Sequence, residues 1–272
     1  MNAPFLADLA ILAHPALARF KAFALLTAYL DESGMHGSAR ATVVAGAVGL
    51  PDQWRQVERE WRIHLDRFGL IDPSASRDGF HAQPCQRGRD EFKHIPEDQR
   101  NRLILALAGS MADHGLTAIG SAVALDDWRS LDAPDLKKRF PKPYNLAFEH
   151  CIQQINSWSA ENVGGEKVSL VFAQHQEFAK IAAKVGEAYQ RSVEFGAQIS
   201  GVSFADARQF GMVQTGDLIA YESYRWAEQM IAEDQTLRPA MQVLAATGRM
   251  KGGFYNAEAL SKLAARGPVG IL

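Results

Sequence analysis

LLTAYLDESG, residues 25–34, is an apolar run that ends in two adjacent carboxylates, Asp31 and Glu32. An apolar run of this length, bounded by turn residues, predicts a buried strand over 25–30. Two charges at the end of a buried strand are unfavourable unless a partner compensates them, and a divalent metal is one such partner because hard cations bind carboxylate oxygens. The alternative is a strand that leaves the core through a polar turn, with Asp31 as its cap.

The composition is that of an ordinary globular protein. The chain has 272 residues, of which 47% are hydrophobic and 22% are charged, which suits one large domain or two small ones. Its 29 basic and 31 acidic side chains give a net charge of −2, so any surface that binds nucleic acid must be a local basic patch.

Features that would indicate another compartment are missing from the sequence. Cys85 and Cys151 form no Cys-x-x-Cys pair, which favours reduced thiols in a cytoplasmic protein. The N-terminal residues carry no basic region, so we expect no signal peptide. No run of about 18 uncharged apolar residues occurs, so we expect no membrane span.

The predicted elements describe an α/β fold in which helices flank a mixed central β-sheet. Strands are predicted at 25–30, 41–50, 116–125, 167–173 and 198–204, and helices at 51–68, 97–114, 144–160, 176–191 and 212–232. The short connection after the first strand predicts an antiparallel hairpin with the second. We expect an N-terminal helical extension at 1–24, the α/β domain at 25–235 and a helical C-terminal appendage at 236–272.

The segment 69–96 is predicted to be a long irregular loop, and such loops are often functional. It contains His81, whose ordinary pKa near 6.5 suits proton transfer, although a single histidine is more often structural. Its cations are Arg77, Arg87, Arg89 and Lys93. A second basic stretch, 132–143, is either a phosphate contact or a solvated loop.

Asp217 lies near the start of the last long helix and shares a helix face with Gln214, Tyr221 and Arg225. Hydrolysis of a phosphodiester by two metals needs carboxylates from separate elements, converging on ions about 3.5–4 Å apart. Asp31 is a candidate bridge between two Mg²⁺ or Mn²⁺ ions, with Glu32 and Asp217 completing the site. Asp126 and Asp127 also follow a predicted strand, but they read equally well as a helix start.

Several common catalytic motifs are absent from the sequence. There is no phosphate-binding glycine loop, no Gly-x-Ser-x-Gly, no paired-cysteine metal site and no His-Glu-x-x-His. These absences weigh against nucleoside triphosphate hydrolysis, serine hydrolysis and zinc proteolysis.

Three pieces of the chain, YLDESG (29–34), FHA (80–82) and VQTGDLIAYESYR (213–225), resemble the domain of unknown function 3800, a bacterial and phage family with a suspected ribonuclease H-like fold. Their order and spacing match over most of residues 26–230. The resemblance implies that Asp31, Glu32, His81 and Asp217 are the polar site positions. It also implies supporting roles for Tyr221 and Glu222.

The chain departs from this family at two places. The family commonly has an acid after the strand that matches 167–173, whereas Gln174 and His175 stand here and Glu177 is the nearest carboxylate. This departure implies a one-metal site, a histidine ligand or an inactive descendant. Thr215-Gly216 also stands where the family predicts a less flexible turn.

We therefore expect a nuclease or phosphodiesterase that acts on nucleic acid with Mg²⁺ or Mn²⁺. Asp31, Glu32 and Asp217 are the predicted metal ligands, and His81 is the predicted general acid or base. The residues expected to contact substrate are Ser33, Arg77, Arg87, Lys93, Gln214 and Tyr221. The alternatives are a non-catalytic binding module in a phage-defence or mobile-element system, and a transferase built on the same carboxylates; metal affinity separates the binding module from the nuclease.

Overall fold

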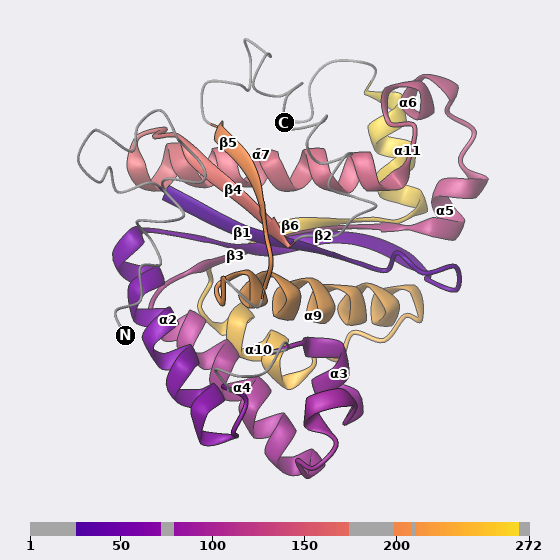
Figure 1. The fold of residues 1–272 in the computed structure, drawn as a ribbon. Coiled ribbons are helices and arrows are strands. Elements are labelled where there is room, and N and C mark those ends of the chain that lie inside the picture. Colours follow the sequence, from indigo (N-terminus) through magenta and orange to yellow (C-terminus); the bar gives the residue numbers. More distant parts are fainter. Residues whose placement is uncertain (1–25, 72–78, 174–198, 208–209, 267–272) are drawn as a thin grey trace.

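The computed structural model describes residues 26–71, 79–173, 199–207 and 210–266. In this part of the chain a central sheet has the order β5-β4-β1-β2-β3-β6 (Figure 1). The strands are β1 Leu26–Ser33, β2 Ala41–Gly49, β3 Thr117–Ala124, β4 Val168–Ala173, β5 Ile199–Ala205 and β6 Met250–Tyr255. The predicted helical extension at 1–24 and the predicted helix at 176–191 lie outside the described residues.

The sheet is mixed, as predicted. β1 pairs antiparallel with β2, and β2 pairs antiparallel with β3, which confirms the hairpin. β4 is parallel to β1, β5 to β4, and β6 to β3. β1 is therefore a central strand, and its C-terminal residues Asp31 and Glu32 lie within the sheet, paired with Ala45 and Val44 of β2.

Helices cover both faces of the sheet (Figure 1). One layer contains α2 Pro51–Arg67, α3 Ala82–Arg87, α4 Glu97–Asp113, α9 Val213–Ile231 and α10 Pro239–Ala246. The other contains α5 Leu125–Ser130, α6 Pro134–Arg139, α7 Pro143–Val163 and α11 Ala257–Ala265. The α/β class with helices on both faces of a mixed sheet is thus confirmed.

Helix α2 shows how the sequence specifies the layer on the α9 side. Pro51 suits the first turn, and the predicted stripe of Trp54, Val57, Trp61 and Leu65 is buried. The Trp54 ring packs edge-on against Tyr29 of β1 at 4.6 Å between centroids, and its Nε1 donates to the Thr27 carbonyl at 2.9 Å. The tryptophans of this stripe are therefore core residues.

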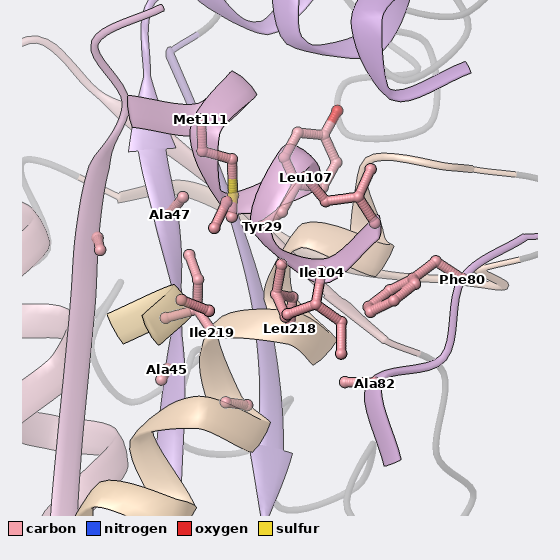
Figure 2. Packing of buried hydrophobic residues seen from close by; sticks show 14 of the residues in the cluster. Tyr29, Ala45, Ala47, Phe80, Ala82, Ile104, Leu107, Met111, Leu218 and Ile219 are labelled. Carbon is pink, nitrogen blue, oxygen red and sulfur yellow. The ribbon is translucent and has the colours of Figure 1, made fainter. Parts of the chain in front are cut away.

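The core on this side joins β1 and β2 to α4 and α9. Figure 2 shows Tyr29 with Leu107 and Met111 of α4 and with Leu218 and Ile219 of α9. Phe80, two residues before α3, and Ala82, its first residue, belong to the same cluster (Figure 2). The segment that carries His81 is thus anchored from both sides of that residue.

Three segments contain more regular structure than their sequences indicate. The predicted loop 69–96 contains α3 and a single 3₁₀ turn, Asp90–Phe92, and the basic stretch 132–143 contains α6. Helices this short show no clear hydrophobic period, so local signals alone predict a loop. The tail, expected to be helical, does contain α10 and α11, but it also contains β6, which extends the sheet beside β3.

The structure also shows where the second acidic pair and the two cysteines lie. Asp126 and Asp127 lie in the first turn of α5, and the Asp127 carboxylate accepts a hydrogen bond from the Ala257 N–H, so these residues serve helix starts. Cys85 and Cys151 are buried and unpaired. Among the described residues, no helix has the length and apolar character needed to cross a membrane.

Candidate functional site

The two aspartates of the predicted site come together where α9 crosses β1. Gly216 makes this crossing close, because a β-carbon added there would lie 2.9 Å from the Leu30 carbonyl carbon and 3.2 Å from the Asp31 nitrogen. The next residue of α9 is Asp217. The Thr215-Gly216 departure from the family pattern therefore has a structural reason, since the absent side chain lets the helix rest on the strand backbone.

Each aspartate accepts a backbone hydrogen bond. Asp31 Oδ1 accepts from the Glu32 N–H at 2.8 Å, and Asp217 Oδ2 accepts from the Ala82 N–H at 2.7 Å. Hydrogen bonds of this kind favour the ionised carboxylate. The first bond fixes Asp31 relative to its own strand, and the second ties Asp217 of α9 to the start of α3.

The two aspartates interact electrostatically. Burial raises the pKa of Asp31 well above its ordinary value, and the neighbouring carboxylates of Asp217 and then Glu32 raise it further. Burial also raises the pKa of Asp217, while the Ala82 N–H and His81 counteract part of that rise. Two half-buried carboxylates that repel each other are stabilised by a bound proton or by a cation between them.

His81 lies at the edge of this pair. Its Nδ1 is 3.9 Å from Asp217 Oδ2, and its side chain is 44% exposed, so the ring can reach both the carboxylate and solvent. His81 is the residue before α3, and the next residue, Ala82, supplies the N–H that binds Asp217. The same short segment therefore positions both the histidine and the aspartate.

Gln214 holds that segment in place. Its Oε1 accepts from the Phe80 N–H at 2.9 Å and from Trp61 Nε1 at 3.0 Å, and its Nε2 donates to the Ala207 carbonyl. The residue is only 3% exposed. Gln214 was expected to contact substrate, but its amide is engaged inside the protein, and the structure gives it a positioning role.

Glu32 does not join the two aspartates on their face of the sheet. Successive side chains of a strand point to opposite faces, and Leu30 packs in the cluster on the α7 side while Tyr29 packs on the α9 side. Glu32 follows Leu30, and its charge contributes to raising the pKa of Tyr144 on α7. Burial raises the pKa of Glu32 itself to about 7, and its Oε1 is buried without a hydrogen-bond partner.

The residues expected to contact substrate lie on different elements and differ in exposure. Arg87 ends α3 and is exposed, and Tyr221 lies one turn after Asp217 and is half-buried. Ser33 ends β1 and is half-buried, and Lys93 is exposed after the 3₁₀ turn. Arg77 lies outside the described residues, as do Gln174, His175 and Glu177.

An ion pair for which the sequence gives no signal connects the helices around the site. Arg238, the residue before α10, donates from Nε and Nη2 to both carboxylate oxygens of Glu222, at 2.9 and 3.1 Å. The Glu222 side chain is fully buried, and Arg238 Nη2 also donates to Gln86 of α3 at 2.6 Å. This network links α3, α9 and the residue before α10.

The donor set is small for a metal site. Within the described ranges, no three His, Cys, Asp or Glu side chains are grouped so as to hold a metal ion. Asp31 and Asp217 offer two carboxylates from two elements. Mg²⁺ suits such a set, because it keeps several waters and commonly binds one or two carboxylates together with substrate phosphates.

An apolar cavity of about 270 Å³ lies elsewhere, between β3, β6, α9 and α10. Ile219, Trp226 and Met241 line it, and none of the predicted site residues does. Its lining does not suit a phosphate or a metal, so it is separate from the carboxylate site.

Comparison of the chain with models of protein families, with curated proteins and with solved structures found no match in any of the three.

Proposed function

We propose that this protein hydrolyses phosphodiester bonds in nucleic acid with Mg²⁺ or Mn²⁺ bound by Asp31 and Asp217. The observation that carries the proposal is the pair of half-buried carboxylates on β1 and α9, each oriented by a backbone N–H, whose mutual repulsion a bound cation would relieve. The metal, when bound, would polarise the phosphate and lower the pKa of a bound water.

The residues around the pair have distinct roles in this proposal. Asp31 and Asp217 would bind the ion, and the Ala82 N–H restricts the orientation of the Asp217 carboxylate. His81, exposed and 3.9 Å from Asp217 Oδ2, would donate a proton to the leaving oxygen or take one from water. Glu32 is not among the proposed ligands because its side chain lies on the α7 side of the sheet, away from the two aspartates.

The topology supports a ribonuclease H-like version of the α/β fold. Three strands, β1 to β3, form an antiparallel meander, and β4 and β5 continue the sheet in parallel on the other side of β1. Membership in the domain of unknown function 3800 remains our proposal, on the three sequence pieces described above. The two buried, unpaired cysteines support a cytoplasmic location.

Cleavage of a labelled oligonucleotide tests the proposal. With Mn²⁺ present, the wild-type protein should produce cleavage products, and Asp31→Asn should produce none. His81→Ala should lower the rate by about 10²–10⁴-fold, which is the usual contribution of a general acid or base. Asp126→Asn, at an exposed aspartate on α5, is the matched control and should retain full activity.

A second function is favoured by one observation, the presence of only two carboxylates in the described site. A non-catalytic module of the same fold, in a phage-defence or mobile-element system, would bind its partner without hydrolysis. It would tolerate Asp31→Asn with little change in binding, and no cleavage would be detected with any divalent metal.

A further inference from the structure

Arg87 is an exposed cation on α3, the short helix whose first residue, Ala82, donates its N–H to Asp217. It lies in the last turn of α3, and no ion pair or hydrogen bond in the described part of the chain involves its guanidinium. Neighbouring arginines differ in this respect, since Arg225 pairs with Glu228 and Arg238 pairs with buried Glu222. Arg87 therefore keeps its donors for a ligand.

Tyr221 lies one helical turn beyond Asp217 and is linked to the end of α3 through Arg238, which donates to Gln86, the residue before Arg87, at 2.6 Å. Burial raises the pKa of Tyr221, and the positive charges of Arg238, Arg225 and Arg87 each counteract part of that rise. The Arg238 guanidinium lies over the Tyr221 ring, 5.9 Å from its centroid, and its charge is matched by Glu222. Arg238 thus holds the ring, while Arg87 stays available.

The exposed edge of α9 therefore changes from acidic to basic along its length. Asp217, Tyr221 and Arg225 recur every four residues, so each step advances about 6 Å along the helix axis at 1.5 Å per residue. An anion held by a metal at Asp31 and Asp217 lies at the acidic end. A ligand that also uses Arg87 and Tyr221 must carry a second anionic group about one turn away.

We propose that Arg87 and Tyr221 bind the phosphate next to the scissile one, so that the substrate is an oligonucleotide strand lying along α9 toward Arg225. This inference rests on the proposed function and adds its substrate class. Arginine offers a planar fork of donors that matches a phosphate, and a tyrosine hydroxyl adds one more donor. Such contacts read the backbone and not the bases. A mononucleotide or a simple phosphomonoester would leave this second position unused.

Binding of a fluorescein-labelled single-stranded thymidine 12-mer, measured by anisotropy with Ca²⁺ at several salt concentrations, tests the inference. Arg87→Ala should weaken binding about tenfold at low salt, because it removes a charge-assisted contact, and should reduce the salt slope by about one. Tyr221→Phe should weaken binding about threefold through loss of one hydroxyl donor. Arg87→Lys, which keeps the charge without the fork, should fall between wild type and Arg87→Ala.

Arg129→Ala is the matched control, because Arg129 is an exposed arginine on α5, in the other helix layer, and should leave binding unchanged. Thymidine 5′-monophosphate should bind equally well to wild type and to Arg87→Ala. Equal losses for the 12-mer and the mononucleotide would place Arg87 at the scissile phosphate and would overturn the inference.

Metal binding separates the two proposals. If Arg87→Ala binds Mn²⁺ like wild type and loses affinity for the 12-mer, the inference stands. If wild type binds Mn²⁺ but not the 12-mer, or if Arg87→Ala binds the 12-mer as wild type does, the inference is false while the proposed metal site is untouched. Absence of Mn²⁺ binding by wild type would overturn both.

Discussion

At the scale of single residues, the surroundings of Asp31 disfavour the ionised form of its carboxylate. It is flanked by the carboxylates of Asp217 and Glu32, and its main local compensation is the Glu32 N–H. Residues arranged for function often lower stability in this way. Without metal, the aspartate pair should therefore destabilise the fold.

We expect Asp31→Asn to stabilise the metal-free protein by about 1–2 kcal/mol at pH 8, because it removes a half-buried charge that lies next to two other carboxylates. The amide oxygen can still accept from the Glu32 N–H. Since burial raises the pKa of Asp31 in the folded state, the gain should shrink as the pH falls and Asp31 takes up a proton. Urea unfolding with a chelator measures this, with exposed Asp126→Asn as control. A loss of stability would show that the Asp31 charge has a partner in the metal-free protein.

His150 gives a second prediction at this scale, on the α7 side of the sheet. It is buried, with Nδ1 3.2 Å from Ser121 Oγ and Nε2 2.9 Å from Gln154 Nε2, and burial lowers its pKa to about 4. The unfolded chain protonates below about pH 6.5 while the folded protein does not, so stability is lost as the pH falls from 6.5 toward 4.

Between pH 7 and pH 5, wild type should lose about 2 kcal/mol more stability than His150→Gln, from 1.36 kcal/mol per pH unit over this window. Urea unfolding of both proteins at the two pH values measures the difference, and the other titrating groups cancel between them. Parallel losses would mean that His150 titrates normally in the folded protein.

At the scale of elements, the site depends on how closely α9 rests on β1. Gly216 permits this approach, and the Gln214 amide and the Asp217 carboxylate fix the Phe80–Ala82 segment against the same helix. Strand and helix therefore set the two aspartates, and the same helix helps to hold the segment with His81.

Gly216→Ala should destabilise the protein by about 1–3 kcal/mol, because the new methyl group overpacks the backbone of Leu30 and Asp31. Alanine is the better helix former by about 1 kcal/mol, so a loss would show that close packing outweighs propensity. Thermal or urea unfolding measures the change.

Gly109→Ala is the control for this substitution. Gly109 lies inside α4, with no other atom within 4 Å of an added β-carbon. Alanine there should stabilise the protein by about 0.5–1 kcal/mol. Stabilisation by both substitutions would contradict the close approach of α9 to β1.

At the scale of the whole molecule, residues far apart in sequence brace the site. Arg238 joins Glu222 and Gln86, so the part of the chain expected as a C-terminal appendage contributes directly to the packing of α3 on α9. β6 from the same part completes one edge of the sheet. The fold is built from the tail as well as from the segment that bears the carboxylates.

Arg238→Met should destabilise the protein by about 3 kcal/mol, because it leaves the fully buried Glu222 carboxylate without its partner. The double variant Arg238→Met/Glu222→Met should recover most of that loss. Arg225→Met, which breaks the more exposed pair with Glu228, should change stability by no more than about 1 kcal/mol. A double variant no more stable than Arg238→Met would argue against the ion pair as the cause.

Sequence reasoning succeeded where the pattern is local and periodic. The apolar run before Asp31, the stripe of Trp54 to Leu65 and the helix face that carries Asp217 and Tyr221 each follow from a period of two or 3.6 residues. The alternation of side chains along a strand also predicts that Glu32 lies on the sheet face opposite Asp31. Strand order, by contrast, depends on long-range pairing.

Other features have no local signal. The engagement of Gln214 by Trp61 and Phe80, and the link from Arg238 to Gln86, join residues between 134 and 153 positions apart, and no short motif encodes them. α3, α6 and β6 are too short, or too rich in glycine, for a period to be visible. These features are therefore visible only in the folded structure.

The most direct test of the central claim is calorimetric titration of Mn²⁺ into wild type and into the Asp31→Asn/Asp217→Asn double variant. We expect binding by wild type that disappears in the double variant, which should remain folded because both amide oxygens can keep their backbone hydrogen bonds. Equal binding by both proteins, or no binding by wild type, would contradict a metal site formed by the two aspartates.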